Sequence, residues 1–126
     1  MTDLIKSLSI AASGMQAQSQ RLRHVSENIA NADTPGYHRK TISFRDAVEG
    51  DGVLPGPVRL DRSELTKIYD PGHPLADETG HFDGSNVDLV IEIADAREAQ
   101  RSYDANLRIF DQARQMTQSL FEILRR

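Results

Sequence analysis

The sequence has no cysteine and no tryptophan, and aromatic residues make up only 6% of its 126 residues. The absence of cysteine excludes disulfide bonds, thiolate metal sites and cysteine nucleophiles, and it leaves the redox compartment open. Hydrophobic residues account for 38% of the chain, so we expect a single domain with a thin core. The apolar residues gather at the two ends, which favours extended helices that are completed by partners.

The sequence also lacks a long apolar run and a strongly basic segment. No run is long enough to cross a bilayer, and Met1–Ile10 has neither the basic start nor the unbroken apolar core of a cleavable signal peptide. We therefore expect a cytoplasmic protein, or one exported with its N-terminus intact. The net charge of −4 falls within residues 33–86 and both ends are near neutral, so nucleic acid is not an expected partner.

No set of residues is arranged as an active site. The chain has no Ser-His-Asp spacing, no glycine-rich phosphate loop after a strand, and no close pair of carboxylates outside polar loops. His73 and His81 lie in a proline-broken loop, and the nearby Asp77, Glu78 and Asp83 do not have the spacing of a calcium site. We expect a solvated loop there, with no metal, no other cofactor and no catalytic residue.

Residues 1–33 are predicted to form an N-terminal amphipathic helix. Its apolar residues alternate by four and three, with one polar interruption, and the small residues of Ser9–Gly14 would allow another helix to approach closely. The pattern fits either a core-facing helix of a small bundle or a coiled-coil seam, and in both cases the helix cannot bury its stripe alone. The stripe consists of Leu4, Leu8, Ala11, Met15, Gln18, Leu22, Val25, Ile29 and Ala32.

The end of this helix is expected within residues 28–37. Asn31 can adopt the left-handed backbone of a helix end, and the proline that follows prevents the helix from continuing. The next four residues fit a type II turn, with proline second and glycine third. The stretch is either an ordinary helix-terminating turn or a place where Asn28 and Asn31 fix a register. The turn residues are Thr34, Pro35, Gly36 and Tyr37.

Residues 34–84 are predicted to form a middle region rich in turns and loops, with two or three short strands. Tyr37–Phe44 and Val58–Leu60 are the strand candidates, and Glu49–Gly52 and Leu54–Pro57 are expected to break the chain between them. Arg39 and its neighbour Lys40 are expected at a solvated strand edge. A contact with an acidic neighbour is the alternative.

A second long helix is predicted over residues 85–126, and Ser85 with Asp88 resembles a capping box at its start. Tyr103 and Phe110 lie one heptad apart, which is more typical of a core than of a ligand site. Asn106 lies between them and is expected to set the register, with exposure to solvent as the alternative. We therefore predict a mainly α fold in which the terminal helices pair as an antiparallel coiled coil. The stripe of the second helix is Ala99, Tyr103, Asn106, Phe110, Ala113, Thr117, Leu120 and Leu124.

Several stretches resemble one protein family. Asn28–Tyr37 resembles the signature of the bacterial flagellar rod and hook proteins, whose pattern is close to N-I-A-N-x-x-T-P-G-Y. Tyr69–Pro74, Asn86-Val87 and Arg101–Asn106 are similar to the Y-D-P-x-H-P, P-N-V and R-S-Y-x-A-N stretches of the proximal rod proteins in that family. Ser85 stands where proline is usual before Asn86, a departure that bears only on how the last helix begins.

The resemblance implies a structural subunit of the proximal rod of the bacterial flagellar basal body, in its periplasmic region. It further implies polymerisation into a hollow shaft that transmits motor torque, and export through the flagellar type III system. The implied partners are other copies of the chain, the rod proteins FlgB, FlgF and FlgG, the adaptor FliE and the export apparatus, with no direct membrane span. We expect the terminal helices to carry the contacts between subunits and to become ordered on assembly. The expected interface residues are Leu4, Leu8, Ala11, Met15, Leu22, Val25, Asn28, Ile29, Asn31, Tyr103, Asn106, Phe110, Ala113, Leu120 and Leu124.

Two other functions fit the residues less well. An enzyme would depend on scattered acids and histidines, and changing His73 or His81 should then abolish turnover. A free-standing helical hairpin that acts as a soluble binding module would be a monodisperse, cooperatively folded monomer or dimer with both helices formed in isolation.

Overall fold

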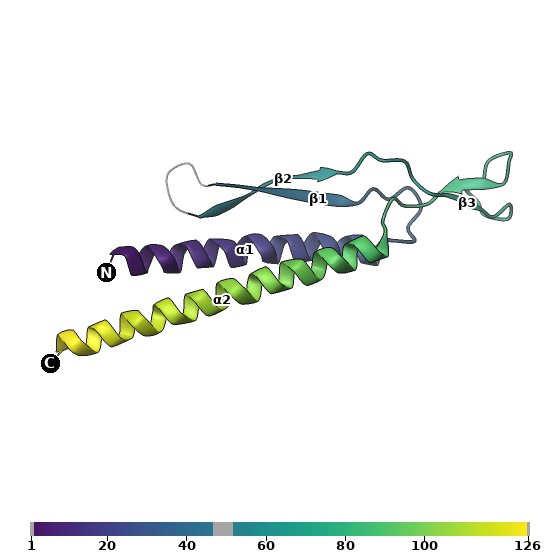
Figure 1. The fold of residues 1–126 in the computed structure, drawn as a ribbon. Helices are drawn as coiled ribbons and strands as arrows, with labels where there is room; N and C mark the ends of the chain where they lie inside the picture. The colour runs from purple at the N-terminus through teal and green to yellow at the C-terminus, as the bar shows by residue number, and fades with distance from the viewer. Residues whose placement is uncertain (1, 47–51, 126) are drawn as a thin grey trace.

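The protein is described by a computed structural model that covers residues 2–46 and 52–125. Two long helices lie at the ends of the chain, and short antiparallel strands lie between them in sequence. The mainly α fold expected from the sequence is therefore confirmed. The helices run antiparallel, and both chain ends lie at the same end of the molecule (Figure 1). In chain order the elements are α1 (Thr2–Ala30), β1 (Lys40–Asp46), β2 (Val53–Leu60), β3 (Lys67–Tyr69), β4 (His81–Asp83) and α2 (Leu89–Arg125).

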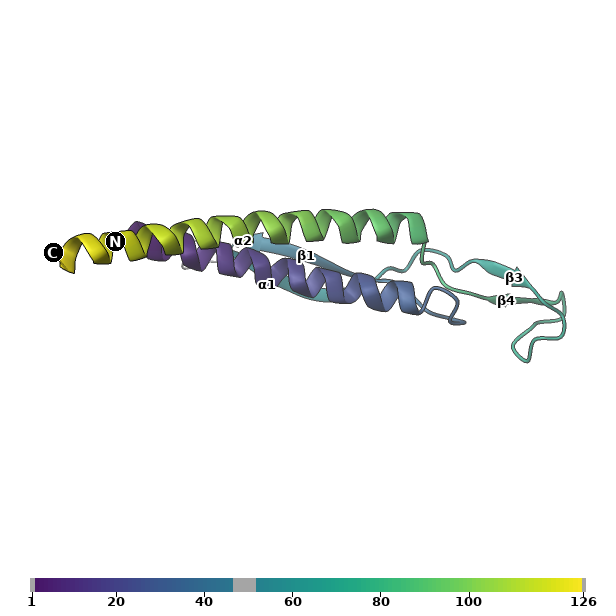
Figure 2. The same cartoon turned by 90° about the horizontal axis from the view of Figure 1, so that it is seen from below.

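The α1 helix lies between the β1–β2 ribbon and α2. The β1–β2 ribbon runs along one side of α1, and α2 runs along another, as Figures 1 and 2 show together. The ribbon is also tied to α1 by a hydrogen bond of 3.1 Å from the Val53 N–H to the Ser13 hydroxyl. The β3–β4 hairpin extends beyond the end where the helices meet the ribbon. As a result α1 is covered on two faces, whereas the backbone of α2 comes close only to that of α1 among the described elements.

The register of the helix pair follows from facing residues. Asn28 of α1 bonds to Glu92 of α2, and Gly14 faces Asn106 so closely that a Cβ at Gly14 would lie 2.7 Å from the Asn106 Nδ2. The expected close approach at the small residues of α1 is therefore present. The same register puts the start of α1 opposite residue 118, so residues 119–125 extend beyond it by about 10 Å.

The core of the single chain is small. Among the described residues the buried apolar side chains are mostly alanines, and large apolar side chains remain exposed along both helices. The molecule exposes 9091 Å² of surface, and a compact monomer of 14.1 kDa is expected to expose about 6,700 Å². The chain thus leaves much apolar surface uncovered. The buried apolar residues are Ala11, Ala17, Val25, Ala99 and Ala113.

Helix α2 begins later than the sequence predicted, at Leu89 rather than near Ser85. Asp88 caps it, because its Oδ1 accepts a hydrogen bond of 3.0 Å from the Val90 N–H. The Ser85 hydroxyl instead donates to the carbonyl of Ala32, two residues after the end of α1. The predicted capping box is therefore wrong, because Ser85 ties the segment before α2 to the turn after α1 and Asp88 caps the helix.

The described residues of the middle region form four short strands in two separate two-stranded sheets, more than the two or three that were predicted. The expected break at Leu54–Pro57 is wrong, because these residues lie inside β2. Prolines are tolerated there because a two-stranded ribbon has a free edge, where no backbone N–H is required. The register of the ribbon shifts between Ile42 and Phe44. The predicted turn at Glu49–Gly52 lies outside the described residues except for Gly52.

Two further features concern the helices. No residue other than glycine has a positive φ in the described chain, so the left-handed conformation predicted for Asn31 is wrong. The Asn31 side chain closes the helix instead, by donating a hydrogen bond of 2.8 Å to the Glu27 carbonyl. Within residues 2–46 and 52–125, neither helix is apolar enough over its length to cross a membrane.

Candidate assembly site

The Asn28 side chain is fully buried at the place where α1, β1 and α2 meet. Its Nδ2 donates to the Lys40 carbonyl at 3.0 Å and to the Glu92 Oε2 at 3.2 Å. Its Oδ1 accepts from the Lys40 N–H and from the Tyr37 hydroxyl, both at 2.8 Å. Both donors and both acceptor positions of the amide are used, so the buried side chain has no polar group without a hydrogen-bond partner. One side chain thus joins four segments of the chain.

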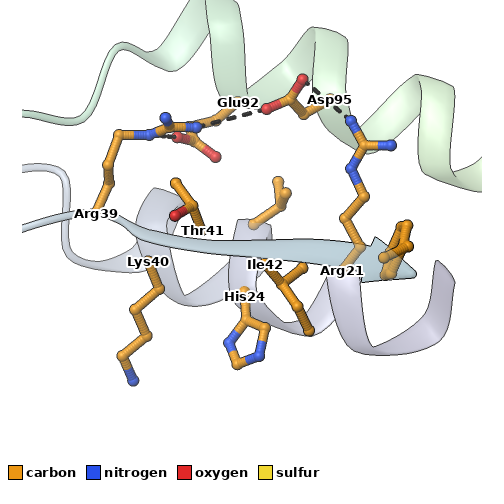
Figure 3. Close-up of a pocket in the computed structure, with 10 residues that line it drawn as sticks. Arg21, His24, Arg39, Lys40, Thr41, Ile42, Glu92 and Asp95 are labelled. Atoms are coloured by element: carbon orange, nitrogen blue, oxygen red, sulfur yellow. Dashed lines mark hydrogen bonds and ion pairs between the residues drawn. The ribbon is translucent and has the colours of Figure 1, made fainter. Parts of the chain in front are cut away.

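Glu92 is also fully buried, and its partner is Arg39. The Arg39 Nε lies 2.6 Å from the Glu92 Oε1, and the guanidinium lies 3.5 Å from the carboxylate of Asp95 (Figure 3). The carboxylate of Asp61 also lies 3.5 Å from the guanidinium. Burial by itself would lower the pKa of Arg39, but the hydrogen bonds and charges of Glu92 and Asp61 outweigh it, so the pKa is raised. The predicted solvated edge is therefore wrong for Arg39, and the alternative, contact with acidic neighbours, is confirmed.

Asn86 completes the arrangement from the segment before α2. Its Oδ1 accepts a hydrogen bond of 2.7 Å from the Arg39 N–H, and its Nδ2 donates one of 2.8 Å to the Asp61 carbonyl. Successive residues of an extended chain direct their backbone groups to opposite edges. Asn28 therefore pairs with one edge of this segment at Lys40, and Asn86 pairs with the other edge at Arg39. We call the group of Asn28, Arg39, Lys40, Asn86 and Glu92 the polar joint.

The motif turn holds the chain that leads into the polar joint. Gly36 has a φ of 75°, and the Tyr37 N–H donates to the Thr34 carbonyl at 3.2 Å, as expected for the predicted type II turn. The Gly36 N–H is itself bound to the Gly84 carbonyl at 3.0 Å. Pro35 is exposed. The turn thus fixes the direction in which Tyr37 reaches back to α1.

The predicted interface residues differ in how far the single chain buries them. Ala11, Val25, Asn28 and Ala113 are buried, while Ile29 and the last two leucines of the set are exposed. The other predicted residues are half-buried. These are Leu4, Leu8, Met15, Leu22, Asn31, Tyr103, Asn106 and Phe110, and the exposed leucines are Leu120 and Leu124. The structure covers part of this set within one molecule and leaves the rest accessible, and the role of these residues in contacts between subunits stays a prediction.

The sequence interpretation missed Glu92 as a structural residue. Glu92 lies seven residues before Ala99 and so occupies a position of the α2 stripe. An acid at a stripe position is a signal for a buried ion pair, because an unpaired buried carboxylate is costly. Arg39 gave no comparable signal, because its partners come from segments far away in the chain.

The β3–β4 hairpin carries the histidines that were considered for a metal site. The rings of His73 and Phe82 stack with their centres 3.9 Å apart, and those of Tyr69 and His81 lie 5.1 Å apart. Hydrogen bonds from Thr79 and His81 lower the pKa of Asp77. In the part of the chain that the structure describes, no three histidine or acidic side chains gather in a way that could hold a metal ion.

Comparison with known proteins gives agreement at both ends of the chain. Residues 8–38 match the family model for the flagella basal body rod protein, and residues 78–123 match that for the C-terminal part of the flagellar basal body rod FlgEFG proteins. A flagellar basal-body rod protein FlgC from Agrobacterium fabrum is 46% identical over 99% of this chain and 98% of its own length. Those of Salmonella typhimurium and Borreliella burgdorferi are 35% and 31% identical, over 90% and 96% of this chain and 92% and 97% of their own lengths.

Proposed function

The chain belongs to the FlgC family of flagellar basal-body rod proteins, and from this membership we propose that it forms part of the proximal rod, the hollow shaft that carries motor torque across the periplasm. It is a structural subunit that assembles with other rod components. The neighbours that we propose are further copies of the chain, FlgB, FlgF, FlgG and the adaptor FliE.

The main support is the imbalance between the core and the surface of a single copy. The chain exposes about 2,400 Å² more than a compact monomer of its mass. A stable protein–protein interface buries roughly 1,200 to 2,000 Å² in total, so the excess is of the size that contacts with neighbours require. Exposed apolar side chains occur along both helices, which agrees with a subunit surrounded on several sides.

The small core also agrees with export in an unfolded state. A chain whose buried apolar side chains are mostly alanines has little hydrophobic stabilisation to lose when it is threaded through a narrow channel. The polar joint, by contrast, forms only when distant segments meet. We propose that the chain travels unfolded through the flagellar type III apparatus and that the joint forms once the chain has left it.

Deletion and recovery of the protein test this function directly. Deleting the gene should abolish swimming, and a tagged copy should restore it and be found by mass spectrometry in purified basal bodies. The free-standing binding module predicts instead a soluble monomer or dimer that is absent from these particles. Normal swimming of the deletion strain, or absence of the tagged chain from basal bodies, would contradict the proposal.

A further inference from the structure

Helix α2 carries a second apolar stripe that faces away from α1. Ile109, Met116 and Ile123 are spaced by seven residues, and 51%, 51% and 67% of their surfaces are exposed. Ala105, Gln112 and Ser119 alternate with them. At 3.6 residues per turn this set lies about a third of a turn away from the stripe that contains Ala99 and Ala113. We call these six residues the outer seam.

The outer seam has the form of a helix-packing surface. Large apolar side chains at one heptad position alternate with uncharged ones at the next, of which Ala105 and Ser119 are small, and such a surface can accept the side chains of a facing helix. The groove at its C-terminal half is formed by α2 alone, from Gln112, Gln115, Met116, Ser119, Leu120 and Ile123. The β1–β2 ribbon lies on α1 and not on this part of α2 (Figure 1). The outer seam is therefore complete in shape but has no partner among the described residues.

The exposed face of α1 matches the outer seam in length and chemistry. This face consists of Ile5, Ser9, Ala12, Gln16 and Ser19, all exposed, which we call the outer face of α1. The whole segment from residue 7 to residue 20 contains no charged side chain. Helix faces that stay in water usually carry charged side chains. A neighbouring helix can cover an uncharged face without removing any charged group from water. The outer seam spans about 27 Å and the outer face about 21 Å, so most of each can be in contact.

We propose that the outer seam of one copy packs on the outer face of α1 of a second copy. Large side chains of the seam then meet small side chains of the neighbour, and neither side buries a charge. The two surfaces lie on different helices, so every copy offers one and accepts the other, and the contact can repeat from copy to copy. This inference rests on the proposed function, because it names the contact between adjacent subunits of the rod.

The first test replaces the large residues of the outer seam. The triple variant Ile109→Ser, Met116→Ser, Ile123→Ser should be exported normally but recovered in basal bodies at a level roughly tenfold or more below the unmodified chain. A matched control changes three apolar residues of α2 outside the seam, Val90, Ile93 and Leu107, which are 77%, 47% and 40% exposed, to serine. The control should be recovered within about twofold of the unmodified chain.

The result separates the two proposals. Recovery of the unmodified chain together with equal recovery of both triple variants would overturn the contact and leave the rod function intact. Absence of the unmodified chain from basal bodies would instead contradict the rod function. Circular dichroism and urea unfolding of both triple variants should match those of the unmodified chain, because all six residues are exposed in the single copy.

The second test uses the absence of native cysteine. One chain carries Met116→Cys, a second carries a cysteine at Ser9, Ala12 or Gln16, and both are produced in the same cells. Mild oxidation of isolated basal bodies should give a disulfide-linked pair with at least one of the three α1 positions. A chain with Leu107→Cys should give none. Equal linking from residues 107 and 116, or no linking from residue 116 at any of the three positions, would refute the contact.

Discussion

Replacing Asn28 by alanine should destabilise the folded chain. The loss should be larger than for the same change at Asn86, the other uncharged residue of the polar joint. The change at Asn28 removes a side chain that is fully buried and makes four hydrogen bonds. The groups left behind are the N–H and C=O of Lys40, the Tyr37 hydroxyl and one carboxylate oxygen of Glu92. Of these, the Tyr37 hydroxyl belongs to a half-buried side chain and can turn to water.

The magnitude follows from the groups that stay buried. A buried polar group without a partner costs about 1 to 3 kcal/mol, and a charged one costs more. Water admitted to the vacated space restores part of this, so the expected loss is about 2 to 4 kcal/mol rather than the full sum. Asn28→Asp should cost more than Asn28→Ala, because it places a second carboxylate against that of Glu92.

Urea unfolding of the full chain, followed by circular dichroism and tyrosine fluorescence, measures the effect. With a urea dependence typical of small proteins, the expected loss lowers the midpoint by about 1 to 2 M. Asn31→Ala is the matched control, because the hydrogen bonds of the Asn31 amide to the Glu27 carbonyl and the Thr34 hydroxyl are local to the end of α1. A midpoint for Asn28→Ala equal to that of the Asn31 variant would refute the idea that Asn28 joins the segments.

Three further predictions concern the turn at Gly36, the pH dependence of stability and the order of the helices in the single chain. Gly36→Val should reduce recovery in basal bodies more than export, because valine is strained at a φ of 75°, by roughly 1 to 2 kcal/mol; equal effects on export and recovery would contradict this. The pKa of Glu27 is lowered from its ordinary value of 4.5 chiefly by a hydrogen bond from Lys40, so the folded state binds fewer protons and stability should fall as the pH drops below 4.5. Urea midpoints should show this loss, and Glu27→Gln should reduce it. In the dilute chain, amide exchange should be fast across residues 4–14 and 106–125, and strong protection there would show that assembly is not needed to order them.

The sequence was sufficient for the helices because their signals are local. The four-and-three spacing of Leu4 to Ile29, and of Ala99 to Leu124, depends only on neighbours along the chain. The turn at Thr34–Tyr37 was likewise predictable from proline and glycine, whose backbone preferences do not depend on tertiary contacts.

The polar joint could not be predicted in the same way, because its partners are distant in the chain. Asn28 meets Lys40 across the Thr34–Tyr37 turn, and Arg39 meets Glu92 only when the chain has returned from the middle region to α2. The start of α2 was placed too early for a related reason, since Ser85 caps a neighbouring segment rather than its own helix. The prolines of β2 suggested a break because the pattern does not reveal which edge of a strand is free.

The paired amides of Asn28 and Asn86 have a consequence for how the ribbon is aligned with the helices. A primary amide carries a donor and an acceptor side by side, so each asparagine acts as a one-residue substitute for an adjoining strand. If the ribbon slipped by one residue, every side chain on it would change face, and Arg39 would turn away from Glu92 while both amides lost their matching backbone groups. The alignment is therefore all-or-none. The ribbon either makes all of these contacts in the correct register or leaves Glu92 and both amides without their partners.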